Sequence, residues 1–109
     1  MTLDEFLAVE VMGYIKESRH DYRGFHGEIY KREGLSPILC SSWQPIKNIS
    51  HAFQCLGKFE EWEVFKDHVY FVRINNFVET KFQGEAQDEN LLLAISLACA
   101  RARGYDESD

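Results

Sequence analysis

The stretch "FEEWEVFKDHVYFVRINNFVETKF", residues 59–82, decides the fold class. Aromatic and β-branched residues dominate it, and they predict three strands, at 59–65, 69–74 and 77–82. Residues 66–68 supply a first turn, and Asn75-Asn76 supply a second because asparagine tolerates positive φ. Strands joined by such short turns pair antiparallel, so we expect an antiparallel sheet.

The middle predicted strand, residues 69–74, is apolar on both of its faces. Phe71 points to one face and Val72 to the other, so we expect both faces to be covered. The strand predicted at 77–82 alternates apolar and polar residues, as an edge strand does. The sequence therefore predicts one α+β domain, residues 1–104, whose mainly antiparallel sheet carries helices on both faces. A polar tail, residues 105–109, follows it.

Three helices are predicted around these strands. They run from residue 3 to 12, from a start between Pro45 and Asn48 to Leu56, and from an Asp88 cap to Arg103. Thr2 and Glu5 form a capping box at the first helix, and Gly13, Gly57 and Gly104 follow the three ends. The expected core includes Trp43, Phe53, Val72, Leu92 and Ile95.

A hairpin is predicted between the first two helices. The stretch "FHGEIYKR" at 25–32 forms one strand, and a turn at Glu33-Gly34 follows. The stretch "LSPILCSS" at 35–42 returns as a short strand, which Pro37 restricts to an edge because proline cannot donate to a ladder.

Composition bounds the class of protein. A chain of 109 residues with 45% apolar residues predicts a single globular domain, and the net charge of −6 argues against general affinity for double-stranded nucleic acid. Three cysteines without a C-x-x-C pair suit a reducing cytosol. The first residues show no secretory signal, and the longest apolar run, 91–100, is shorter than the roughly 20 residues that span a bilayer. We expect no membrane partner and no cofactor.

Three motifs occur together in this order: "LAVEVMGY" at 7–14; Trp43-Gln44-Pro45 before a helix with Ile49, Ala52 and Phe53; and Ala94-Ile95 with Ala98 before Gly104. With them the chain resembles, over nearly its whole length, the phage ABA sandwich domain family, small proteins encoded mostly by bacteriophages. The resemblance implies a sheet covered by helices on both sides and implies no catalytic residues. Ile46 and Lys47 depart from it, because the family favours Ser or Thr caps there.

The stretch "SRHDYRGFHGEIYKR", residues 18–32, interleaves basic and aromatic side chains. Arginine offers a planar fork that fits phosphate oxygens, and aromatic faces stack on bases. The ligand-binding residues predicted on this basis are Arg19, Tyr22, Arg23, Phe25, His26, Tyr30, Arg32 and Trp43. The alternative is a solvated loop with an edge hairpin, because acidic residues leave 16–33 at only about +1.

Catalytic and metal sites are not predicted. His20 and His26 lack the spacing of known zinc ligands, and no cysteine is close in sequence. Residues 40–42 offer a thiol and two hydroxyls, with His51 as a candidate base, but no nucleophile elbow frames them.

The favoured function is that of a small, non-enzymatic phage-type accessory protein in the cytosol of the bacterial host. We expect it to counter host defence by sequestering a nucleotide-derived signal where two copies meet, in a homodimer or higher oligomer. The alternative is an inhibitor that docks on a host or phage enzyme through an exposed strand or its acidic surface. The weakest alternative is a small hydrolase that uses His20 or His26.

Overall fold

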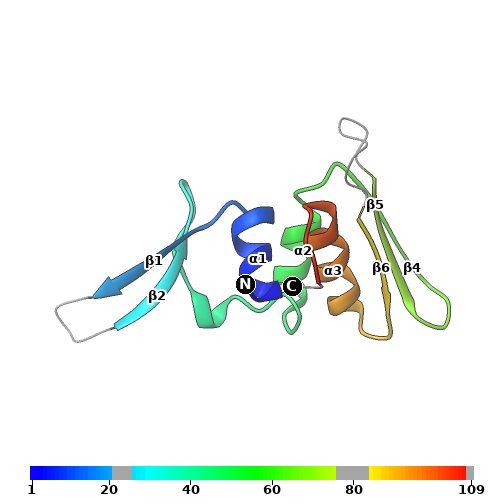
Figure 1. The fold of residues 1–109 in the computed structure, drawn as a ribbon, viewed down its shortest axis with the longest axis horizontal. Helices are drawn as coiled ribbons and strands as arrows, with labels where there is room; N and C mark the ends of the chain where they lie inside the picture. Colours follow the sequence, from blue (N-terminus) through cyan, green and yellow to red (C-terminus); the bar gives the residue numbers. More distant parts are fainter. Residues whose placement is uncertain (21–25, 76–83, 108–109) are drawn as a thin grey trace.

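A computed structural model describes residues 1–20, 26–75 and 84–107. The elements in chain order are α1 (Leu3–Phe6), the π-helical turn η1 (Leu7–Val11), β1 (Ile15–His20), β2 (His26–Lys31), β3 (Ile38–Leu39), the 3-10 turn η2 (Cys40–Ser42), α2 (Ile49–Leu56), β4 (Glu61–Lys66), β5 (Tyr70–Asn75), β6 (Gly84–Asp88) and α3 (Leu91–Ala102). The strands form two antiparallel three-stranded sheets, sheet A (β1–β2–β3) and sheet B (β4–β5–β6). The helices lie between the two sheets (Figure 1). The α+β class is confirmed.

The single sheet expected from the sequence is replaced by these two sheets. In sheet B, Val64, Val72 and Ala86 lie opposite one another and turn toward α3, which contacts β5 and β6. Phe71 points to the other face, where its neighbours Arg73 and Glu85 are exposed. Within the described ranges, helices therefore cover one face of sheet B, and the predicted sandwich arrangement is not confirmed.

The core is centred on α3, whose buried residues lie all round the helix. It contacts sheet B on one side and α2 and η1 on others, so every residue of Leu91–Ala102 is buried or half-buried. Trp43, Val72 and Ile95 are buried as predicted, and Leu92 is partly buried against the core. Phe53 was placed wrongly in the core, since 40% of its surface is exposed.

The reason for the error at Phe53 is the orientation of α2. This helix buries Ala52, Cys55 and Leu56, so its apolar stripe is rotated away from Phe53. The Phe53 ring instead meets the half-exposed Trp62 of β4 edge-on, at 6.4 Å between centroids.

Capping explains where the helices begin and end. Thr2 Oγ1 accepts the amide of Glu5 at 3.2 Å, and Gly13 follows η1 at φ 74°, so the predicted ends of the first helix are confirmed. The third helix starts differently: Asn90, rather than Asp88, accepts the amides of Leu92 and Leu93. Asp88 instead accepts the amide of Asn90 at 2.8 Å.

Sheet A differs from the predicted hairpin in its partner strand. β2 lies where a strand was expected, but it pairs along its whole length with β1 and only briefly with β3. β1 has the polar sequence "IKESRH" and no apolar alternation that could have revealed it. Ion pairs such as Lys31–Glu17, at 2.8 Å, link β2 to it across the sheet.

Sheet B also contains one strand that the sequence did not indicate. β6 follows the segment 77–82, whose predicted strand lies outside the described residues. Gly84 lets β6 approach α3 so closely that an added Cβ would lie 2.1 Å from the carbonyl oxygen of Ala98. After α3, Tyr105 contacts Phe6 edge-on at 4.9 Å, so the segment expected to be a polar tail begins against the domain.

Candidate functional site

The eight residues predicted to bind a ligand fall into three groups in the structure. Tyr22, Arg23 and Phe25 lie outside the described residues, and of His26 the structure describes the backbone, as the first residue of β2. Arg19 is exposed on β1, and Arg32 is half-buried just after β2. Tyr30 and Trp43 are brought together in the core.

Tyr30 and Trp43 join sheet A to the helices. Their exposed fractions are 4% and 2%, and both rings contact Tyr14. Trp43 Nε1 donates to the backbone oxygen of Asp4 at 2.9 Å, and burial raises the pKa of Tyr30 to about 12. These two side chains therefore pack the core, and the described surface of the predicted site is reduced to its arginines.

His51 does not face the nucleophile candidates at residues 40–42 as a free base. Its ring stacks on Trp43 at 4.8 Å, and Nδ1 accepts the backbone amide of Gln44 at 3.1 Å. Partial burial lowers the pKa of His51, against the attraction of Asp4. The neutral ring therefore bears its proton on Nε2. Its bond to Gln44 fixes the segment that leads into α2.

The thiols are equally occupied with packing. Cys40 is half-buried against the core, and burial raises the pKa of its thiol. Cys55 and Cys99 are fully buried beside each other, and burial raises the pKa of Cys55 to about 12. The thiolate is the reactive form of cysteine, and a raised pKa keeps the thiol protonated. These cysteines therefore serve as small packing residues rather than as nucleophiles.

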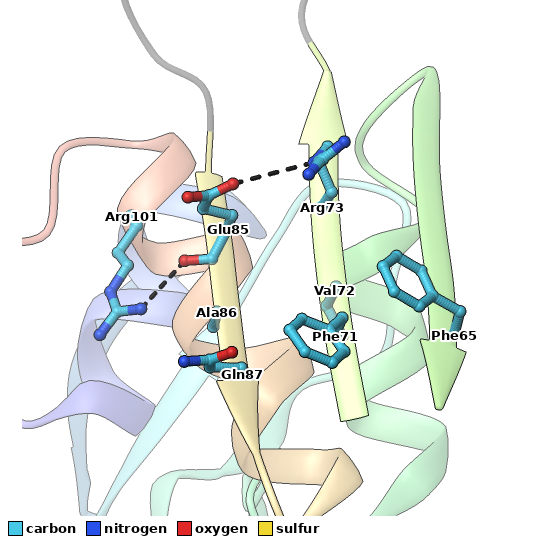
Figure 2. A pocket seen from close by; sticks show the side chains of 8 residues that line it. All are labelled: Phe65, Phe71, Val72, Arg73, Glu85, Ala86, Gln87 and Arg101. Carbon is cyan, nitrogen blue, oxygen red and sulfur yellow. Dashed lines mark hydrogen bonds and ion pairs between the residues drawn. The ribbon is translucent and has the colours of Figure 1, made fainter. Parts of the chain in front are cut away.

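A hollow on the uncovered face of sheet B has the shape of a site. Its volume is about 360 Å³. Figure 2 shows the side chains around it, among them Phe65, Phe71, Arg73, Glu85, Gln87 and Arg101. We call the side of sheet B that carries Glu61, Glu63, Phe65, Phe71, Arg73, Glu85 and Gln87 the open face.

Antiparallel pairing arranges the open face in rows across the strands. One row contains Phe65, Phe71 and Gln87, and the two phenyl rings stack at 5.0 Å with 11° between their planes. Phe65 remains 48% exposed. Phe71 is half-buried beside it, so the pair presents apolar surface mainly through the Phe65 ring, and no element in the described ranges covers it.

The next row of the open face is charged. Glu63, Arg73 and Glu85 lie opposite one another, and Arg73 Nε is 3.8 Å from Glu85 Oε2. Both partners of that pair are more than half exposed, so water screens it and it contributes little to stability. The row presents two carboxylates and one guanidinium beside the phenyl rings.

Arg101 limits the open face at its edge strand. From α3 it reaches past β6, donates Nη1 to the backbone oxygen of Glu85 at 2.9 Å and Nε to Glu107 at 2.6 Å. Figure 2 shows this bond on the far side of β6 from Arg73. Arg101 thus links β6 to α3, and its guanidinium forms an ion pair with Glu107.

Sequence reasoning missed the open face because Phe71 was taken as evidence for burial. The contrary signal was present: Glu61, Glu63 and Arg73 share that face, and charged residues are almost never buried unless they are paired. The apolar residues on both sides of β5 are then explained by one buried face and by Phe71, which is half-buried against the Phe65 ring on the other.

In the part of the chain that the structure describes, no three or more His, Cys, Asp or Glu residues are grouped to hold a metal ion. No helix there combines the length and the apolar character needed to cross a membrane. Comparison with known protein families, with curated proteins and with solved structures found no match. The resemblance to the phage ABA sandwich domain family stays a prediction.

Proposed function

We propose that this protein is a non-enzymatic binding protein that docks on another protein through the open face of sheet B. The observation that carries the proposal is the stacked pair of an exposed Phe65 and a half-buried Phe71, on a sheet face that no described element covers. Phenylalanine is enriched at the centres of protein interfaces, where its ring gives much contact area for little loss of side-chain entropy.

The setting of the aromatic pair fits such an interface. Charged and polar side chains surround the two rings, and a polar rim around an apolar centre is the usual anatomy of a protein contact. The hollow beside the rings offers a place for one partner side chain. Short ladders between three strands give the face a rigid support, so little ordering would be needed on binding.

The absence of catalysis is part of the proposal, and the state of the candidate nucleophiles supports it. Burial keeps the thiols of Cys40 and Cys55 protonated by raising their pKa. His51 already uses Nδ1 to accept a backbone amide.

A role in countering host defence within the bacterial cytosol fits a protein of this kind, and it rests on the resemblance to the phage family. Sequestration of a nucleotide-derived signal stays a prediction for residues 18–32. Tyr30 and Trp43 are buried, so two of the aromatic rings predicted to stack on the signal cannot reach it. The geometry therefore favours docking on a protein. The homodimer that sequestration requires also stays a prediction.

A peptide-display selection on the purified protein tests the docking surface. Peptides selected from a random library are titrated into the labelled protein, and the amide signals that shift are assigned to sheet B or elsewhere. We expect shifts in β4, β5 and β6, and we expect Phe65→Ser to weaken binding by about tenfold or more, the cost of losing an aromatic anchor.

Phe53→Ser is the matched control, because Phe53 is also about half-exposed but lies on α2, away from the open face. It should bind the selected peptides as the unmodified protein does. Binding that tolerates Phe65→Ser, or shifts confined to other elements, would refute the assignment of the open face.

A further inference from the structure

We infer that the partner segment that docks on the open face is basic, and that one of its arginine or lysine side chains lies against the Phe65–Phe71 pair. The inference rests on the proposed function and adds the chemistry of the partner. It follows from the charges around the two rings and from the geometry of the row next to them.

The open face has a surplus of negative charge. It carries three carboxylates, those of Glu61, Glu63 and Glu85, and one guanidinium, that of Arg73, which already lies beside Glu85. Within the described ranges, no cation pairs with Glu61 or Glu63. Two carboxylates are therefore left to meet positive charge from outside, on a protein whose net charge is −6.

The aromatic pair and the carboxylates are spaced for a single cationic side chain. Residues two apart on one strand face are about 7 Å from each other, which places Glu63 one step along from Phe65. A guanidinium can stack on an aromatic face and donate in its own plane to a carboxylate. A partner arginine lying on the Phe65 ring could thus reach Glu63 at its tip, on the side of the ring away from Arg73 and Arg101, which line the hollow.

Other occupants meet the wrong charge. A phosphate-bearing ligand on the rings would approach the unpaired carboxylate of Glu63, and the two nearby cations are already engaged, Arg73 by Glu85 and Arg101 by Glu107 and the backbone of β6. A second copy related by a two-fold axis would place this acidic face against itself, and like charges across an interface are costly. A basic partner relieves the repulsion that the other two create.

The test uses two amidated synthetic peptides of about ten residues, in which arginine, or glutamate in its place, alternates with serine and leucine. Each is titrated into the labelled full chain at about 50 and about 300 mM salt, and amide shifts are followed. We expect the arginine peptide to shift signals of β4, β5 and β6, and to bind several-fold more weakly at the higher salt concentration. The glutamate peptide should shift none of them.

Two charge-neutralising variants sharpen the comparison. Glu63→Gln should weaken binding of the arginine peptide by about three- to fivefold, the scale of a partly exposed ion pair. Glu33→Gln removes the same charge from an exposed position near sheet A and should leave the affinity unchanged. Unfolding curves of both variants should match the unmodified protein, which separates a binding effect from loss of structure.

The outcomes distinguish the partner's chemistry from the docking surface itself. If the glutamate peptide binds the open face as well as the arginine peptide, or if library peptides bind there without basic residues, the inference is wrong and the proposed function stands. If no peptide of either kind shifts sheet B, both are wrong. A dimer in sedimentation that Phe65→Ser dissociates would assign the open face to a second copy and overturn the inference.

Discussion

Gly84→Ala would place a methyl group directly against the backbone of α3. Gly84 begins β6 and is buried against α3. An added Cβ would lie 2.1 Å from the carbonyl oxygen of Ala98 and 2.7 Å from both Cβ and the amide nitrogen of Ala102. Ordinary contacts begin at 3.4 Å, so the strand and the helix would have to separate by more than an ångström at this point.

The magnitude follows from what the new methyl group would meet. Overpacking a core costs about 1–3 kcal/mol when side chains can rotate away, and occasionally more. Here two of the three nearest atoms belong to the backbone of α3, which cannot rotate away. We therefore expect Gly84→Ala to lower the free energy of unfolding by about 3 kcal/mol or more, a large share of the 5–15 kcal/mol typical of a domain.

Urea unfolding followed by tryptophan fluorescence measures this difference, with Gly57→Ala as the control. Gly57 has φ −64°, which any residue adopts, and an added Cβ would lie 3.3 Å from the oxygen of Phe53. The control should stay within about 1 kcal/mol of the unmodified protein. A Gly84→Ala variant that unfolds within the same limit would refute the close approach of β6 to α3.

Two further predictions concern the core and its pH dependence. Phe53→Ala should lower the free energy of unfolding clearly less than Trp43→Ala does in the same urea assay. Phe53 is 40% exposed, whereas truncating a buried aromatic side chain costs about 3–5 kcal/mol. Equal losses of stability would contradict the orientation of α2. Burial lowers the pKa of His51 below its ordinary 6.5, so the unfolded chain binds the proton more readily and stability should fall as pH drops through 6.5. Burial raises the pKa of Asp4 and acts in the opposite direction, but at pH values nearer 3.8. His51→Phe should therefore flatten the dependence of stability on pH near 6.5.

The predictable part of the fold is the part in which local pattern and tertiary packing agree. The aromatic stretches of β4 and β5 indicated strands at nearly the observed bounds, and the Thr2 cap and Gly13 marked the first helix. For α2, the start and end could be predicted, but periodicity assigned Phe53 to the buried stripe. A small rotation of the helix moves such a residue to the surface, and the rotation depends on packing against elements such as α3 that are distant in sequence.

The parts that could not be predicted depend on partners distant in sequence. β6 reads "GEAQD", with residues that are depleted in strands, and it forms because Gly84 allows contact with α3 and Ala86 packs into the core. β1 is polar and is defined by its pairing with β2. For the candidate site, sequence chemistry predicted Tyr30 and Trp43 as binding residues, and Trp43 as a core residue too, because an aromatic ring that packs and one that binds look alike in sequence.

Edge strand β6 links the stability of the core to the proposed docking surface. Its inner side carries Gly84 and Ala86 against α3, and its outer side presents Glu85 beside Arg73. Arg101 fastens the same strand through the carbonyl oxygen of Glu85, so α3 fixes the position of the carboxylate from behind. A perturbation that separates β6 from α3 would therefore displace the charged row before it reaches the phenyl rings of β4 and β5. The open face is consequently supported from behind by the close contact of Gly84 with α3, and a preformed binding surface needs such support.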